Sequence, residues 1–371
     1  MTSLLRAGLV AGLVAGLATA VGSAWATPCD SALSSYEFYV STADKSNASA
    51  IVSNHPECFP GGPASSGVQI NNTSFLLAYA IWNALALRQS VDGPLVVGSA
   101  NLKGMAAGAG AGKWNVWGNL TNNDTRQSYS SANGFTAKYN TDVMTSVIGV
   151  DYGLSPTMVL GVSGAFDEGD GSGLNTGPGG SRNAIDSKGY LIAPYFGMQL
   201  SKTLSFDLSA GFGRGRVDTN TNSQAKADRW FAAANLTYNR WFDNIQLTGK
   251  ASLLHGEEDY GNIKDPSTGL RWIGTDARNE VDQLRLGVQA GYWTNGVMPF
   301  ASLAYSNDLR RHTTQFGSPN NPIGRDGWLL GLGVNFYSVK DGLTAGVAYN
   351  YELGRNNQDN QSVMANINLR F

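Results

Sequence analysis

The sequence predicts an all-β fold, an antiparallel transmembrane β-barrel of about twelve strands. From Trp114 onward, apolar residues recur at every second position, which is the period of a β-strand. The residues between them are mostly Gly, Ser, Asn and Gln, as expected for strands that face a wet lumen. The connections alternate strictly between short and long, as they do in outer-membrane barrels.

Residues 1–26 have the features of a secretory signal peptide. Arg6 supplies the positive charge, residues 7–22 are uncharged and small or apolar, and Ala24 and Ala26 form an A-x-A cleavage site. No cysteine stands directly after this site, so a lipid anchor is not expected. We therefore expect an exported protein.

The composition of the rest of the chain favours an exported β protein. Charged residues make up 15% of the sequence, whereas soluble domains have roughly 25%. The net charge of −2 gives no reason to expect nucleic acid as a partner. No apolar run after the signal peptide is long enough for a spanning helix.

Residues 27–67 form a short, polar N-terminal segment with both cysteines of the chain. In an oxidising compartment, Cys29 and Cys58 are expected to form a disulfide that closes this segment. Free thiols, or a metal site that includes His55, are the less favoured alternatives.

Residues 68–112 are predicted to be a linker that contains a helix. The stretch 70–90 is rich in Ala and Leu, Asn72 or Thr73 can cap it, and Asp92-Gly93-Pro94 ends it. The Gly- and Ala-rich residues from Pro94 onward read as a connector.

Residues 113–371 form the predicted barrel. Alternation by itself also fits a soluble β-sandwich with one wet face. The order of the connections favours a barrel, because a sandwich has no reason to keep short turns on one side and long loops on the other. The short turns are expected at 153–156, 201–203, 243–244, 294–296 and 340–342. The long loops are expected at about 122–134, 167–186, 217–226, 256–280, 308–326 and 354–360.

The final strand, S-V-M-A-N-I-N-L-R-F, is expected to pair with the strand of Trp114 and so close the barrel. Closure leaves no unpaired backbone amides in the lipid. The short turns and the last residue, Phe371, are expected on the periplasmic side.

The chain resembles the β-domain of the autotransporter (type V secretion) family. The resemblance rests on K-W-N-V-W-G-N-L (113–120), V-I-G-V-D-Y-G-L (147–154), M-V-L-G-V-S-G-A-F (158–166) and the ending N-I-N-L-R-F. It implies a twelve-stranded barrel in the Gram-negative outer membrane, with an α-helix in the lumen that leads to a passenger outside. Residues 71–90 would be that helix, and residues 27–67 a short passenger-like segment.

The resemblance also implies partners. The β-barrel assembly machinery, together with periplasmic chaperones, would recognise a C-terminal assembly signal at Val363, Ile367, Leu369 and Phe371. Outer-membrane lipid and lipopolysaccharide would surround a barrel that we expect to be monomeric.

Several charged residues fall on the predicted inward face, where they are expected to grip the helix and set the conductance of the pore. These lumen-facing charges are Asp151, Asp207, Lys250, Arg285, Glu352 and Arg370. Asn71-Asn72 resembles the site at which some family members cleave themselves, with Asp151 or Glu352 as the nearby acid. A helix cap is the favoured interpretation of this pair.

Enzymatic activity is not expected. His255 with Glu257, Glu258 and Asp259 at a loop mouth, or His312, could supply a His–carboxylate pair for general acid–base chemistry. However, no G-x-S-x-G nucleophile motif accompanies them. No metal-ligand spacing, phosphate loop or nucleotide motif is found, so we expect no metal and no cofactor.

The sequence thus predicts an outer-membrane barrel that translocates or displays residues 27–67 at the cell surface, with a helix in its pore. One alternative is a porin-like channel that is gated or plugged by residues 27–112. Another is a structural or adhesive surface protein that acts through loops 167–186, 256–280 and 308–326.

Overall fold

A computed structural model describes the barrel and part of the segment before it. The described residues are 35, 47, 51, 76–86, 113–130, 136–175, 182–219, 224–260, 277–313, 323–338 and 342–371. The chain divides into two compact units, Met1–Cys58 and Phe59–Phe371. In the first unit, only Ser35, Asn47 and Ile51 are described, each in helical conformation.

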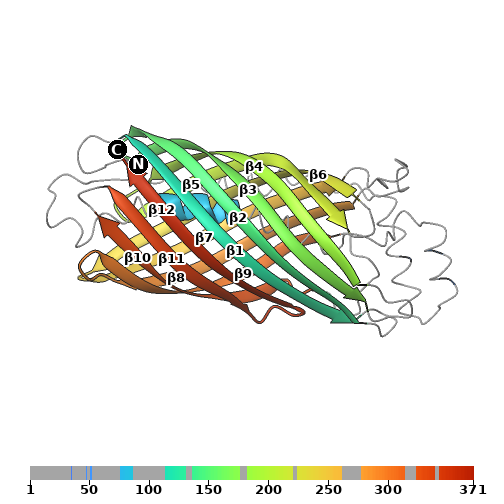
Figure 1. The fold of residues 1–371 in the computed structure, drawn as a ribbon. Helices are drawn as coiled ribbons and strands as arrows, with labels where there is room; N and C mark the ends of the chain where they lie inside the picture. Colours follow the sequence, from blue (N-terminus) through green and yellow to red (C-terminus); the bar gives the residue numbers. More distant parts are fainter. Residues whose placement is uncertain are drawn as a thin grey trace. The chain divides into compact units, whose positions relative to one another are not determined.

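The second unit contains a closed barrel of twelve antiparallel strands, which confirms the predicted fold class (Figure 1). The strands are β1 (Trp114–Ser130), β2 (Thr136–Ser155), β3 (Met158–Asn175), β4 (Arg182–Gln199), β5 (Leu204–Thr219), β6 (Gln224–Phe242), β7 (Ile245–Tyr260), β8 (Ala277–Tyr292), β9 (Val297–Thr313), β10 (Asp326–Ser338), β11 (Leu343–Leu353) and β12 (Gln358–Arg370). Each strand pairs with its neighbours in the chain, and β12 pairs with β1.

The seam between β1 and β12 closes the barrel as predicted. Its register runs from Asn115 opposite Arg370 to Gln127 opposite Gln358. At the end of the seam, the amide of Trp114 donates to the carbonyl of Phe371 at 3.2 Å, and the amide of Phe371 donates back at 3.1 Å. The barrel therefore has no edge strand whose amides would be unpaired in lipid.

The two faces of the barrel wall differ in chemistry. Ile148, Phe166, Phe212 and Leu332 point outward with 63–65% of their surface exposed. Their inward neighbours on the same strands include Thr145, Asp207 and Ser209, which are buried. Large apolar side chains are seldom exposed in such numbers to water, so the outer face is suited to lipid.

The short turns lie where the sequence predicts them, and the local backbone geometry is distinctive in three of them. Asp243 and Asn295 adopt positive φ angles of 52° and 47°, a conformation that Asn and Asp tolerate better than most residues. Gly342 has a φ of 62°, and a Cβ at this position would lie 2.7 Å from the carbonyl oxygen of Arg370.

The strands extend further toward the long loops than the sequence analysis predicted. Pairing of β3 with β4 continues from the membrane band up to Leu174 and Arg182, within the stretch 167–186 that was expected to be a loop. Likewise, β7 and β8 remain paired up to Tyr260 and Ala277. The prediction of loops followed polarity, but ladder hydrogen bonds do not require apolar side chains once the strands leave the lipid.

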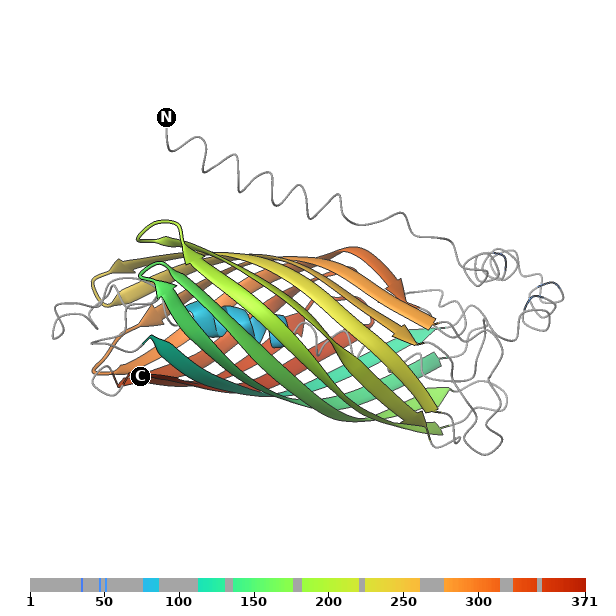
Figure 2. The ribbon, with the colours of Figure 1, turned by 90° about the horizontal axis from the view of Figure 1, so that it is seen from above.

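A helix is described over residues 76–86, and it lies inside the ring of strands in both views (Figures 1 and 2). It falls within the predicted helix 71–90, whose remaining residues lie outside the described part. Among the described residues, none of the helical segments has both the length and the apolar character needed to cross a membrane.

Candidate functional site

The lumen of the barrel, together with its helix, is the candidate functional site. The helix is amphipathic because apolar residues recur at three- and four-residue spacing. Leu77, Ile81 and Leu85 occupy one stripe, and their side chains are 0–1% exposed. Ala78 and Ala84 beside them are small enough to let the helix approach the barrel wall closely.

We call the part of the lumen that receives this stripe the packing wall. It consists of Val147, Val159, Leu191, Phe231 and Leu254, which come from β2, β3, β4, β6 and β7 and form one buried cluster with the helix. Burial of a Leu or Ile side chain contributes about 1.5–3 kcal/mol. Three such side chains are therefore enough to hold the helix against this wall.

The other face of the helix makes polar contacts. The Trp82 indole Nε1 donates to Thr237 Oγ1 at 2.6 Å, and the Tyr79 hydroxyl donates to Gln283 Oε1 at 3.2 Å. Asn83 Oδ1 accepts from the Lys250 ammonium at 3.1 Å. Each hydrogen bond fixes the rotation of the helix in a way that apolar packing alone does not.

Two of the predicted lumen-facing charges lie over aromatic rings of the helix. Lys250 Nζ is 5.1 Å from the centre of the Trp82 ring, and the Arg285 guanidinium is 3.9 Å from the centre of the Tyr79 ring. Both distances are in the range of cation–π attraction. The two cations therefore contact the helix through its aromatic side chains.

The opposite side of the lumen, which we call the polar wall, carries Gln283, Arg285, Ser302, Asn335 and Asn350 from β8, β9, β10 and β11. Between this wall and the helix lies a cavity of about 270 Å³. Tyr79, Trp82 and Asn83 line the helix side of the cavity. The helix thus lies off-centre, packed on one wall and separated from much of the other.

A buried ion cluster lies on the strands of the packing wall. The Arg229 guanidinium donates to Asp167 Oδ1 at 2.7 Å and to Glu258 Oε1 at 2.9 Å, and these three side chains are 0–2% exposed. Gly189 and Gly215 flank the guanidinium, and a Cβ at either position would overlap it. The two glycines are therefore needed to make room for this cation.

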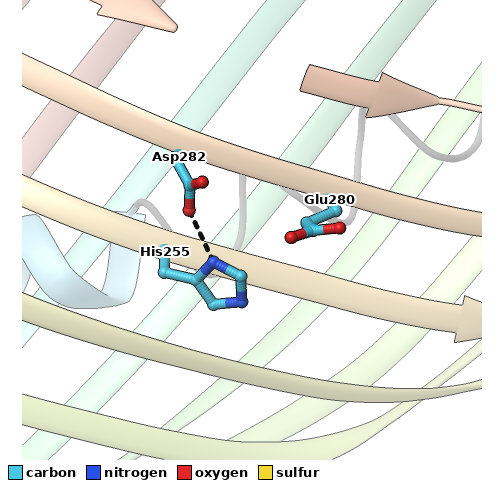
Figure 3. Close-up of side chains that lie close together, drawn as sticks. All are labelled: His255, Glu280 and Asp282. Carbon is cyan, nitrogen blue, oxygen red and sulfur yellow. Dashed lines mark hydrogen bonds and ion pairs between the residues drawn. The ribbon is translucent and has the colours of Figure 1, made fainter. Parts of the chain in front are cut away.

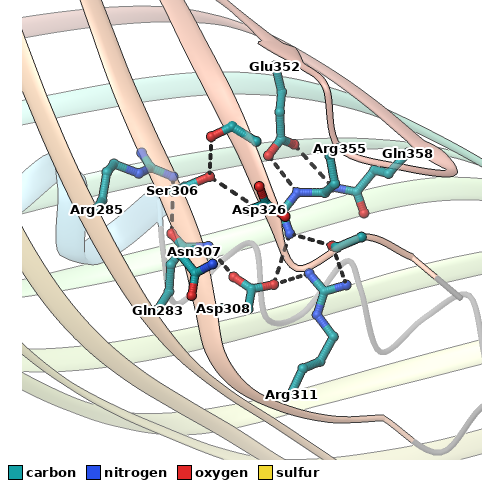
Figure 4. Close-up of polar contacts among 12 residues, drawn as sticks. Gln283, Arg285, Ser306, Asn307, Asp308, Arg311, Asp326, Glu352, Arg355 and Gln358 are labelled. Atoms are coloured by element: carbon teal, nitrogen blue, oxygen red, sulfur yellow. Dashed lines mark hydrogen bonds and ion pairs between the residues drawn. The ribbon is translucent and has the colours of Figure 1, made fainter.

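A second ion cluster lies at the long-loop end of the polar wall (Figure 4). Arg355 donates to Glu352 at 2.6 Å and to Asp308 at 2.9 Å, and Arg311 also pairs with Asp308. Burial lowers the pKa of Arg355, but Glu352 and Asp308 outweigh burial, so this pKa lies above its ordinary value. Arg355 also donates to the carbonyl of Gly324 at 2.9 Å. This hydrogen bond links the loop between β11 and β12 to the loop between β9 and β10.

The remaining predicted charges have other partners. Asp151 accepts from the Tyr195 hydroxyl at 2.8 Å and from Asn115 at 3.2 Å. Asp207 accepts from Asn235 at 2.7 Å. Arg370 is half-buried at the end of β12. The structure thus distributes the predicted charges over several networks and does not gather them at one site.

The residues considered for acid–base chemistry lie on opposite faces of the barrel wall. Glu258 points into the lumen toward Arg229, whereas His255 and Glu257 point outward. The loop mouth predicted for these residues is instead paired strand, and side chains on a strand alternate between faces. The side chain of His312 is outside the described part.

Several predicted residues also lie outside the described part of the chain. They are Ala24, Ala26, Cys29, Cys58, Asn71 and Asn72. Of the predicted assembly-signal residues, Val363, Ile367, Leu369 and Phe371 are all exposed on the outer face, at 44–61%.

The packing wall was missed by the sequence analysis, which expected a small and polar lumen throughout. The signal was present in M-V-L-G-V-S-G-A-F (158–166), where both faces of the strand are apolar or small. There, Leu160 and Phe166 face outward, whereas Val159 and Ala165 face the helix and are fully buried.

Comparisons with known proteins agree with this architecture. Residues 116–350 match the family model of the autotransporter β-domain. No curated protein matches the sequence significantly.

Several solved structures have a similar fold. The chain is similar to the translocator domain of autotransporter NalP from Neisseria meningitidis, with 13% identity, a TM-score of 0.51, and coverage of 71% of this chain and 89% of that one. The β-domain of the Bordetella autotransporter BrkA is 17% identical, with a TM-score of 0.50, and the match covers 70% of this chain and 100% of that one. The transport unit of the autotransporter AIDA-I from Escherichia coli is 13% identical, with a TM-score of 0.53, and the match covers 78% of this chain and 98% of that one.

Proposed function

The chain belongs to the autotransporter β-domain family, and on this premise we propose that its barrel carries residues 27–67 across the membrane and displays them at the cell surface. The fold places the barrel in the outer membrane of a Gram-negative cell. In this proposal, the helix over residues 76–86 stays in the lumen as a plug after translocation.

The observation that carries this proposal is the direction of the helix in the lumen. Tyr79 contacts Gln283, which lies in the half of β8 that is nearer the long loops. One turn later, Asn83 contacts Lys250 and Met364, which lie closer to the short turns. The helix therefore runs from the long-loop end toward the short-turn end, so its first described residue, Leu76, faces the end of the barrel that carries the long loops.

The contacts of the helix support its role as a plug. Its apolar stripe is fully buried against the packing wall, and its other face is held by Thr237, Gln283 and Lys250. A segment that only passed through the pore would not need a complementary surface of this kind. We infer that residues 76–86 rest at this position once the barrel has assembled.

Protease treatment of intact cells tests the display proposal. An epitope inserted between Cys58 and Gly67 should be accessible to antibody and removed by protease, while a periplasmic marker protein stays intact. Permeabilised cells provide the control for total epitope. An epitope that becomes accessible only after permeabilisation would contradict display.

The cavity beside the helix supports a second candidate function, that of a partly plugged channel. This cavity has a volume of about 270 Å³ and lies between the helix and the polar wall. Planar-bilayer recording distinguishes the two functions. Large currents through the complete protein would favour a channel, whereas currents that appear only after deletion of residues 27–112 would favour a closed plug.

We also propose that the β-barrel assembly machinery recognises Val363, Ile367, Leu369 and Phe371. These side chains face outward along β12, where a partner could contact them before closure with β1. Deletion of Phe371 should reduce the amount of heat-modifiable, assembled barrel far more than deletion of one residue in the 261–276 connection. Equal yields of the two variants would contradict this proposal.

A further inference from the structure

Two cations in the lumen have no carboxylate partner among the described residues. They are Lys250 on β7 and Arg285 on β8. On the outer face of the same two strands, by contrast, His255 Nδ1 lies 2.6 Å from a carboxylate oxygen of Asp282 (Figure 3). Two positive charges that lie close together away from bulk water repel each other, so the pair in the lumen attracts an anion.

Both cations are bonded to neutral groups. Lys250 donates to Asn83 Oδ1 at 3.1 Å, and Arg285 Nη2 donates to Gln283 Oε1 at 3.2 Å. Asp207 lies two strands from Lys250, is bonded to an amide of β6 and forms no ion pair with this cation. Arg285 Nε is buried and has no hydrogen-bond partner among the described residues. A buried donor without a partner is costly, so this nitrogen indicates an acceptor that the described chain does not supply.

The helix holds the two cations in place without neutralising them. Lys250 Nζ lies 5.1 Å from the centre of the Trp82 ring, and the Arg285 guanidinium lies 3.9 Å from the centre of the Tyr79 ring. The two rings are themselves 5.9 Å apart. An aromatic ring attracts a cation but carries no net charge. The two side chains are therefore positioned next to each other, and both positive charges remain.

The ladder between β7 and β8 leaves a gap between the two cations. Lys250 is directly opposite Gly287, and Arg285 is two residues from that glycine along β8. Such diagonal positions are roughly 7–8 Å apart, and Gly287 places no side chain between them. All three residues line the cavity of about 270 Å³. The gap therefore opens into the cavity, with one cation on each side.

The neighbouring lining residues offer hydrogen bonds to hydroxyl groups. Gln246, Thr248 and Gln289 continue the inward face of the same ladder and also line the cavity. Gln246 is 3% exposed, and its Nε2 has no hydrogen-bond partner among the described residues. Side-chain amides both donate and accept, as hydroxyl groups do. The cavity volume is close to the lower end of the range for small-molecule sites, roughly 300–1,000 Å³, so a ligand must be small.

We propose that this part of the lumen binds a small carboxylate that also carries hydroxyl groups, of the sugar-acid class. The carboxylate lies between Lys250 and Arg285 and accepts charge-assisted hydrogen bonds from both. The hydroxyl groups contact the amides of Gln246 and Gln289. The site requires the helix to be docked in the lumen, but it does not depend on the display of residues 27–67 or on whether the cavity conducts ions.

Calorimetric titration of the purified full-length protein with D-glucuronate, in detergent micelles at low salt, tests the proposal. We expect saturable binding of one molecule per chain. The affinity should be about 10–100-fold lower in Lys250→Met and in Arg285→Gln, because each variant loses a hydrogen bond to a charged group. Arg216→Gln provides the matched control and should bind as the wild type does, because Arg216 is a 54% exposed cation on the outer face of β5.

Two further measurements separate loss of the site from loss of the fold. Heat-modifiable migration in gels verifies that each barrel is folded, and hydrogen exchange of the helix amides verifies that the helix is docked. Arg285→Lys keeps the positive charge and should therefore bind more tightly than Arg285→Gln. In the wild type, D-glucuronate should also increase the protection of the helix amides, because it binds only the docked state.

Three outcomes overturn the proposal. The first is the absence of saturable D-glucuronate binding by the folded wild-type protein. The second is equal affinity for D-glucose, which has no carboxylate and so would not use the two cations. The third is wild-type affinity for D-glucuronate in folded Lys250→Met and Arg285→Gln, which would place the ligand elsewhere on the protein.

Discussion

The two walls of the lumen hold the helix in different ways. The packing wall contacts Leu77, Ile81 and Leu85 through side chains that exclude water. The polar wall leaves a cavity of about 270 Å³ and reaches the helix through Tyr79 and a few long polar side chains. The packing wall supplies buried apolar contact area, whereas the polar wall supplies contacts that restrict the rotation of the helix.

This difference shows how a barrel can hold a plug without filling its lumen. Apolar packing is strong but tolerates sliding of the helix along a smooth surface, whereas hydrogen bonds and cation–π contacts require one rotation and one height. A wall built only of apolar residues would leave the position of the helix unspecified. Conversely, in a wall built only of polar residues, each polar group would lose its contacts with water when the helix docks, so each hydrogen bond would add little to the stability of docking.

The largest expected effect concerns the ion cluster on the strands of the packing wall. Arg229→Ala leaves the Asp167 and Glu258 carboxylates buried without this partner, and we expect a loss of about 3–5 kcal/mol in the free energy of unfolding. Urea unfolding in detergent micelles measures it. Arg214→Ala on β5 is the control, because the Arg214–Asp228 pair is 74–80% exposed and should contribute less than about 1 kcal/mol. Equal losses would contradict a special role for burial.

The next effect compares the two faces of the helix directly. Ile81→Ala removes a fully buried side chain from the packing wall and should cost about 2–5 kcal/mol of helix docking. Asn83→Ala on the other face should cost about 0.5–1.5 kcal/mol. Hydrogen exchange of the helix amides reports this local opening. A larger effect of Asn83→Ala would reverse the assigned roles of the two faces of the helix.

Much of this fold could be predicted from the sequence, because alternation along a strand directly reflects which side chains share a face. Leu204, Phe206 and Phe212 reveal a lipid-facing strand in this way, and the order of short and long connections indicates a closed barrel. The lengths of the loops could not be predicted, because polar residues such as Glu168 and Lys188 occur both in loops and in strands that extend beyond the lipid.

The site was less predictable than the fold. Alternation assigns Asp207 or Lys250 to a face, but their partners depend on the rotation and height of a helix that is distant in sequence. Alternation is also uninformative where both faces are apolar, as around Val159 and Leu160. The roles of the lumen-facing charges in conductance therefore stay predictions, which the next variants address.

The short hydrogen bond between Trp82 and Thr237 is one of the contacts that position the helix. Trp82→Phe keeps an aromatic ring but removes the donor, and Thr237→Val removes the acceptor. Each should cost about 0.5–1.5 kcal/mol of helix docking. In a double-mutant cycle, the second substitution should cost much less in the presence of the first. Fully additive effects, measured by hydrogen exchange, would show that this bond does not position the helix.

A similarly small effect on stability, and the one that separates charge from packing, is expected for Lys250→Met. The aliphatic part of the side chain can still cover the Trp82 ring, so the loss should be about 0.5–1.5 kcal/mol, from the cation–π contact and the hydrogen bond to Asn83. The charge of the lumen nevertheless changes, because Lys250 and Arg285 both line the cavity. In a barrel that lacks residues 27–112, reversal potentials under a salt gradient should therefore shift toward lower anion preference. Ser201, in an exposed short turn, provides a control as Ser201→Ala. An unchanged reversal potential in Lys250→Met would mean that this charge only anchors the helix and does not influence ion passage through the lumen.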